Sequence, residues 1–221
     1  MTQNRRCLSR LTIGIDASNI LKGGGMTYLR EVMYETILNE NVVDKVLVWG
    51  RQETLDLLED RSWLEKICPP GIDHGWLSRI YWQRFKLSKQ ADITGCDILF
   101  VPGGNHSGNF RPVVTISQNL LPFEWVEIFR YGWSIMTLRF LLLRWLQSRS
   151  FRHADGLIFL TQYAKQQVSH CLGDSQTKSV IIPHGLSNRF RMKPKVQKSI
   201  ADFSKTNPFR ILYVSQIDQY K

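Results

Sequence analysis

Three consecutive glycines form the most distinctive short motif of the chain. They follow an apolar, β-branched run at residues 11–16 and precede a segment with helical apolar spacing at residues 27–38. Because glycine has no Cβ, such a loop turns sharply and brings backbone N–H groups close to a ligand. The N-terminus of the following helix carries partial positive charge, which favours a phosphate group. The loop is neither GxGxxG nor a Walker loop, so a plain glycine turn is the alternative. The candidate diphosphate-binding residues are Gly23, Gly24 and Gly25.

Polar side chains follow two later strand-like runs, at residues 97–101 and 112–116. The carboxyl ends of parallel strands lie on one rim of a sheet, where open α/β folds bind their ligands. We therefore expect these side chains to hydrogen-bond the hydroxyl groups of a sugar or another acceptor, with ordinary loop polarity as the alternative. The four candidates are Asn105, His106, Gln118 and Asn119.

His184 lies in a Pro-His-Gly turn after a further strand-like run at residues 179–182. From this turn the imidazole is a candidate contact for a bound sugar. The alternative is that His184 is an ordinary turn residue.

The candidate site residues lie on a chain in which predicted strands alternate with predicted helices. Short apolar runs predict buried strands, and the segments between them have helical spacing. This alternation predicts an α/β fold: a Rossmann-like, mostly parallel sheet of about six strands flanked by helices. The predicted strands are residues 11–16, 45–49, 97–101, 112–116, 156–160 and 179–182, and the predicted helices are residues 27–38, 53–65, 79–90, 133–153 and 162–171.

Breaks in this pattern predict the domain organisation. Residues 1–185 hold one Rossmann-like domain, and residues 186–208 are polar and basic and are typical of a linker. Residues 209–214 again predict a strand. A parallel strand needs neighbours to cover both of its faces, so we interpret residues 209–221 as the first strand of a truncated second domain. The alternative is an edge strand of the first sheet.

The charge and cysteine content limit the classes of partner. A net charge of +10 favours anionic partners such as a phospholipid surface or a phosphorylated small molecule. Nucleic acid is disfavoured, because the basic residues are dispersed and form no known nucleic-acid-binding motif. None of the four cysteines lies in a CxxC pair or at zinc-ligand spacing. We therefore expect no metal and a cytoplasmic location.

Residues 133–152 form an unusually apolar and basic segment. It is too short to span a bilayer but could lie in a membrane interface, with its arginines reaching lipid phosphates. The alternative is a core helix packed on the sheet, with Arg139 paired to a carboxylate. The first hypothesis predicts a peripheral location on the inner face of the membrane.

Six short segments, in order, resemble the glycosyltransferase family 4 group, whose GT-B fold has two facing Rossmann-like domains. The resemblance covers residues 11–221, and each segment is weak by itself. The segments are Gly14-Ile-Asp with the three glycines, Trp82 to Leu87 with Cys96 to Gly103, Ser117 to Glu124, Arg152 to Thr161, Ile182-Pro-His-Gly185 and Ile211 to Lys221.

The resemblance implies an N-terminal, acceptor-side domain of a transferase that moves a sugar from a nucleotide sugar to an acceptor hydroxyl with retention and without a metal. Lys221 falls where the family places a basic residue, whose positive charge neutralises the donor diphosphate. Gln118 and Asn119 stand where the family often has His-Asp, and Gln216 stands where it often has Arg. The implied acceptor is a glycan or a lipid-linked sugar, as in polysaccharide biosynthesis. With most donor contacts absent we expect the 221-residue chain to be inactive alone; the alternative is a non-catalytic Rossmann-like binding module.

Overall fold

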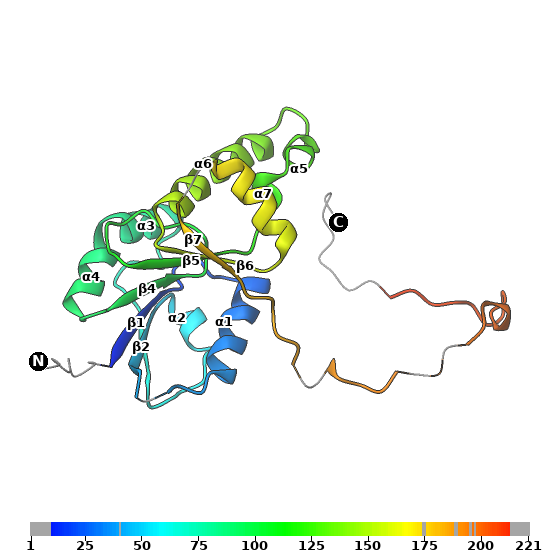
Figure 1. Cartoon of the computed structure of the whole chain (residues 1–221), viewed down its shortest axis with the longest axis horizontal. Coiled ribbons are helices and arrows are strands. Elements are labelled where there is room, and N and C mark those ends of the chain that lie inside the picture. Colours follow the sequence, from blue (N-terminus) through cyan, green and yellow to red (C-terminus); the bar gives the residue numbers. More distant parts are fainter. Residues whose placement is uncertain are drawn as a thin grey trace, which may run out of the picture. The chain divides into compact units, whose positions relative to one another are not determined.

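The computed structural model describes residues 10–39, 41–173, 176–187, 190–194, 196 and 198–212. In these residues a seven-stranded, all-parallel sheet is flanked by helices, which confirms the predicted Rossmann-like α/β fold (Figure 1). The strand order is β3-β2-β1-β4-β5-β6-β7. The strands are β1 (Leu11–Asp16), β2 (Val43–Trp49), β3 (Leu64–Ile67), β4 (Ile98–Val101), β5 (Val113–Ser117), β6 (Gly156–Phe159) and β7 (Lys178–Ile181).

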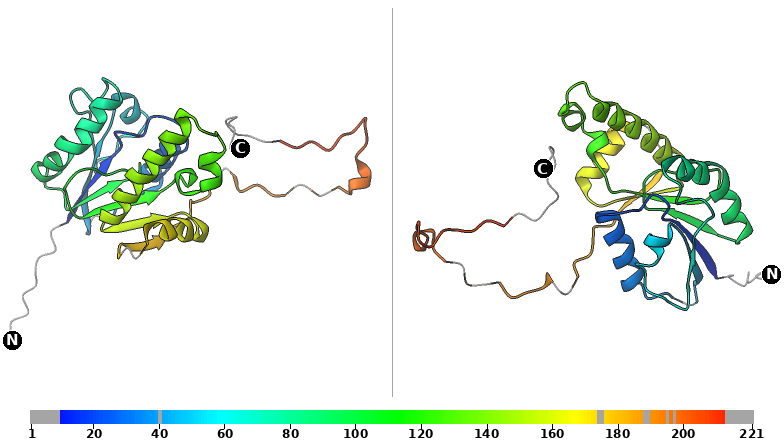
Figure 2. Two further views of the ribbon diagram at one scale, coloured as in Figure 1. Left: turned by 90° about the horizontal axis from the view of Figure 1, so that it is seen from above. Right: turned by 180° about the vertical axis from the view of Figure 1, so that it is seen from behind.

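Helices cover both faces of the sheet. α1 and α2 lie on one face, and α3, α4, α6 and α7 lie on the other (Figures 1 and 2). No helix in the described ranges is long and apolar enough to cross a membrane. The helices are α1 (Gly24–Glu35), α2 (Gln52–Leu55), α3 (Trp76–Tyr81), α4 (Leu87–Ile93), α5 (Trp125–Phe129), α6 (Ile135–His153) and α7 (Gln162–Leu172).

The second half of β2 is buried on both faces, which explains its continuous apolar run. In β2, Val46 and Val48 pack into the core beneath α1 and α2. The alternate residues Leu47 and Trp49 pack on the opposite side, against Trp82 and the residues of α4. A residue in β2 therefore meets a hydrophobic core whichever face it points to.

The segment at residues 53–65 was predicted as a helix, and that prediction is wrong. The helix α2 ends at Leu55, and β3 begins at Leu64 and pairs with β2 in parallel. β3 lies at the edge of the sheet, so only one neighbour is required, and its charged Glu65 and Lys66 interrupt any apolar run. The sheet consequently has one more strand than the six predicted.

The helix predicted at residues 79–90 is composed of three successive segments. α3 passes into a single π-helical turn at Trp82–Lys86, which continues into α4. This turn places Gln83 in the interior, next to the end of β1. A second helical region, a 3-10 turn at Leu121–Phe123 followed by α5, was not predicted.

Two aspartates, one just before β4 and one just before β6, each bind the start of an adjacent strand. The Asp97 carboxylate accepts a hydrogen bond of 2.7 Å from the Thr12 backbone N–H. Asp155 accepts one of 2.8 Å from the Val113 backbone N–H and forms an ion pair of 2.7 Å with Arg111. Each side chain thus satisfies a backbone donor of the adjacent strand, in addition to the regular pairing.

Replacing Asp155 with alanine should lower the free energy of unfolding by about 2 kcal/mol, because the Val113 N–H loses its partner in a partly buried position. Urea unfolding measures this change. The matched control is Asp92→Ala, since the exposed Asp92 carboxylate forms no hydrogen bond in the described part of the chain. Equal stabilities of the two variants would contradict the assigned role of Asp155.

The chain divides into two units, Met1–Pro183 and His184–Lys221. The boundary lies two residues before the end of the predicted first domain. In the second unit, Ser199 caps a short 3-10 helix at Ile200–Asp202. Residues 209–212 form no strand, and the rest of the strand predicted there lies outside the described residues.

Candidate functional site

A cavity of about 150 Å³ lies at the carboxyl ends of three adjacent strands, β1, β4 and β5. From β1 the chain runs outward to β2 and β3 on one side, then returns to β4 on the other. The loops after β1 and β4 therefore diverge in opposite directions, which opens a crevice typical of ligand sites in doubly wound folds. The cavity is lined by residues of these loops, by the residues after β5, and by Gln147 of α6.

The predicted site residues are brought together only in part. Three of the nine line the cavity: Gly25, Gln118 and Asn119. Gly23 and Gly24 directly precede Gly25 but do not line the cavity, and neither do Asn105 and His106. His184 belongs to the second unit, and Lys221 lies outside the described residues.

The glycine loop forms the start of α1. The helix begins at Gly24, and the preceding Gly23 has φ 72°, a left-handed conformation that glycine adopts without strain. No side chain caps this N-terminus, and its first turn holds no acidic residue. A Cβ added at Gly23 or Gly24 would meet nothing within 4 Å. The exposed Lys22 precedes the loop and lines the cavity. Uncapped N–H groups, the helix dipole and a lysine together favour an anion.

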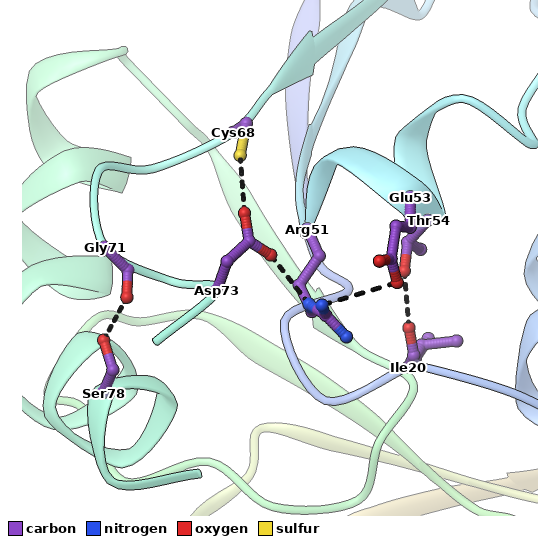
Figure 3. A network of polar contacts seen from close by, with 8 residues as sticks. All are labelled: Ile20, Arg51, Glu53, Thr54, Cys68, Gly71, Asp73 and Ser78. Carbon is purple, nitrogen blue, oxygen red and sulfur yellow. Dashed lines mark hydrogen bonds and ion pairs between the residues drawn. The ribbon is translucent and has the colours of Figure 1, made fainter. Parts of the chain in front are cut away.

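Hydrogen bonds from neighbouring elements hold this loop. The buried Thr54 hydroxyl of α2 donates to the Ile20 carbonyl at 2.8 Å, and Ile20 lines the cavity (Figure 3). Arg51, just before α2, forms ion pairs with Glu53 and with Asp73, at 3.4 Å and 2.7 Å. The network ties the loop after β1 to α2, and α2 in turn to the segment after β3.

A buried polar relay begins at the end of β1. Gln83 Nε2 donates to Asp16 Oδ2 at 2.5 Å, and Asn19 Nδ2 donates to Gln83 Oε1 at 2.9 Å. The Ser18 backbone N–H donates to the other carboxylate oxygen of Asp16. Because Asn19 lines the cavity, the relay positions its amide from the protein interior. Burial raises the pKa of Asp16 above its ordinary value of 3.8, although hydrogen bonds from Ser18 and Gln83 oppose the shift.

The raised pKa of Asp16 gives a pH dependence of known sign. The folded protein binds the Asp16 proton more tightly than the unfolded chain, so this group's contribution to stability falls as pH rises from 3.8 through the raised pKa. Asparagine does not titrate. The difference in unfolding free energy, wild type minus Asp16→Asn, should therefore fall over this interval and be constant above it. Urea unfolding across a pH series tests this, and a difference that grows with pH would contradict it.

Gln147 is a site residue that the sequence did not indicate. Its side chain lines the cavity and is only 7% exposed, yet its Oε1 has no hydrogen-bond partner among the described residues. Gln118, across the cavity, likewise has an unpartnered buried Nε2 in this part of the chain. Gly104, which also lines the cavity, lies next to this amide and has φ 74°, a conformation that favours glycine. Buried amides without partners in a cavity are groups that a hydroxyl-bearing ligand can satisfy.

His106 lies beside the cavity without lining it. Its backbone N–H donates to the Ser150 hydroxyl of α6 at 2.9 Å, which joins the loop after β4 to the helix that carries Gln147. Burial lowers the pKa of His106, which favours the neutral imidazole at pH 7.

The lining of the cavity defines what it can do chemically. Lys22 is the single ionisable residue among the described lining residues, and the other polar side chains are the amides of Asn19, Gln118, Asn119 and Gln147. Lys22 can bind an anion, and the amides can hydrogen-bond hydroxyl groups. These described lining residues supply no carboxylate or imidazole that could act as a general base.

No protein-family model matches the chain, and no curated protein matches its sequence.

Proposed function

We propose that the first unit is the acceptor-side domain of a GT-B-type glycosyltransferase, which transfers a sugar from a nucleotide sugar to an acceptor hydroxyl with retention. The supporting observation is the cavity at the carboxyl ends of β1, β4 and β5, whose lining combines Lys22 and Gly25, next to the uncapped start of α1, with a set of amide side chains. The fold alone hosts many functions, so the proposal rests on this site.

The chemistry of the cavity fits sugar transfer from a phosphate leaving group. In a same-face mechanism the departing phosphate can accept the proton of the attacking hydroxyl, so the site needs anion stabilisation and hydroxyl positioning more than a base. Lys22 and the start of α1 supply the first, and the amides of Gln118 and Gln147 supply the second.

The size of the cavity is consistent with a single ring. Its volume of about 150 Å³ equals that of protein cavities that take up benzene. A whole nucleotide sugar is larger, so its nucleoside portion would lie outside this cavity. The acceptor that we propose is a glycan or a lipid-linked sugar, as the resemblance to the glycosyltransferase family 4 group implies.

Saturation-transfer NMR of the 221-residue chain with UDP-sugars, GDP-sugars and free UDP tests the proposal. We expect binding in the millimolar range that weakens on the order of fivefold in Lys22→Gln, since one charge-assisted contact to phosphate is lost. The matched control is Lys89→Gln, an exposed lysine on α4.

No binding of any nucleotide at millimolar concentration would contradict the proposed anion site. If both lysine variants weakened binding equally, the binding would depend on the overall charge of the protein and not on a site at Lys22. Turnover of a nucleotide sugar after addition of acceptor sugars would exclude the alternative of a non-catalytic binding module.

A further inference from the structure

The long helix α6 exposes an apolar stripe on its outer side. Residues spaced three, four and three apart lie along one side of a helix. These residues and the preceding Trp133 form what we name the α6 outer face. Its members, with their exposed fractions, are Trp133 (93%), Ile135 (88%), Leu138 (67%), Leu142 (54%) and Trp145 (61%).

The opposite side of α6 is buried and largely polar. Thr137 donates hydrogen bonds to the Ile128 and Gly132 carbonyls, and Ser150 accepts the His106 backbone N–H. Gln147 and Ser148 are also buried. Four of the six buried residues of α6 are thus polar, beside Phe140 and Phe151, whereas an apolar stripe faces outward. An ordinary surface helix has the reverse arrangement, so the outer face needs a cover.

The charges on the same side indicate what the cover is. Arg139 and Arg149 are exposed among these apolar residues, and neither forms an ion pair with the described residues. α6 holds four arginines and no aspartate or glutamate. The alternative of a core helix predicted that Arg139 pairs with a carboxylate, and no such pair is present among the described residues. A basic, tryptophan-bearing apolar face matches the boundary between lipid headgroups and acyl chains.

We propose that the α6 outer face docks the protein on an anionic lipid bilayer. The apolar side chains enter the interface, and the two arginines contact lipid phosphates, which attract basic residues near such a surface. A second copy of the chain is a poorer occupant. A two-fold contact through this face would bring arginines of both copies together without a carboxylate from α6 to neutralise them. The proposal does not depend on the transferase activity.

Co-sedimentation of the full chain with lipid vesicles tests the proposal. One set contains phosphatidylglycerol and phosphatidylcholine, and the other contains phosphatidylcholine alone. We expect binding to the anionic set that weakens as salt is raised, because surface charges are screened. The variant Arg139→Glu/Leu142→Glu should lower the partition coefficient by on the order of tenfold or more.

The matched control is Lys89→Glu/Ile93→Glu on α4, which makes the same change in charge at exposed positions away from the outer face. Ile93 and Leu142 are both exposed, at 67% and 54%. Thermal unfolding checks that both variants fold, and Leu138→Glu alone replaces the double variant if that one does not.

Loss of binding in the α6 variant with retention in the α4 control supports the proposal. Absence of binding to anionic vesicles, or equal loss in both variants, overturns it. Sedimentation velocity gives the remaining decisive outcome: a dimer that the α6 substitution dissociates, in a chain that does not bind vesicles, would overturn the proposal in favour of a contact between two copies.

Discussion

Replacing Gly14 with valine should destabilise the protein by about 3 kcal/mol, a decrease in melting temperature of about 6–12 °C. Gly14 lies in β1, and a Cβ there would stand 2.6 Å from Trp49 Cζ3 and 3.0 Å from Cys96 Sγ. The Trp49 ring is fully buried, so it cannot move aside without shifting the core beneath α4. Scanning calorimetry measures the effect.

A matched control for Gly14→Val is Gly50→Ala, at the end of β2. A Cβ at Gly50 would meet Leu55 and Ala17 at 3.4 Å and 3.5 Å, which is close to ordinary contact. This variant should melt within a few degrees of the wild type. Trp49→Leu should lower stability less in the Gly14→Val variant than in the wild type, because the smaller side chain leaves space for the valine. Independent, additive effects of the two substitutions would contradict direct contact between these positions.

Replacing Gly24 with tryptophan should abolish nucleotide binding while leaving the fold intact. Side chains in a helix tilt toward its N-terminus, so an indole at the first position of α1 projects past the uncapped N–H groups where a phosphate would lie. A Cβ at Gly24 meets nothing within 4 Å, so the substitution causes no backbone clash. Saturation-transfer NMR and a thermal melt together measure both parts of this prediction.

Gly24→Ala serves as the control for that experiment. Alanine has no side chain beyond Cβ and favours helix over glycine by about 0.5–1 kcal/mol, so binding should persist and stability should not fall. If the tryptophan variant bound nucleotides as the wild type does, a phosphate at the start of α1 would be excluded.

Six of the seven strands were predicted close to their observed bounds, including the edge strand β7. Residues 11–16 coincide with β1, and β4, β5 and β6 differ from their predicted bounds by about one residue at either end. Each is a continuous apolar run that ends at glycine, proline or a polar residue. β3 was missed because none of its four residues is fully buried, and its Glu65 and Lys66 fit a helix equally well.

The glycine loop and the residues after β5 could be placed near the site because the carboxyl ends of parallel strands share one rim. Gln147 could not be identified in this way. It lies within the long helix α6. The sequence spacing there predicts a helix but not the direction in which the Gln147 side chain points. Whether that position faces the sheet, the cavity or solvent depends on how α6 docks. Asn19, Asp16 and Gln83 were missed for a related reason, because their relay joins the end of β1 to a π-helical turn far along the chain.

The most direct measurement is an NMR titration of the ¹⁵N-labelled chain with the nucleotide sugar that gives the strongest saturation transfer. We expect chemical-shift changes at Lys22 to Gly25, at Gly103 and Gly104, and in the side-chain amides of Gln118 and Gln147. Changes confined to a second cavity, lined by Trp125 of α5 and Tyr163 of α7 among others, would contradict the assigned site. The absence of any change at saturating ligand would contradict the proposed function of this domain.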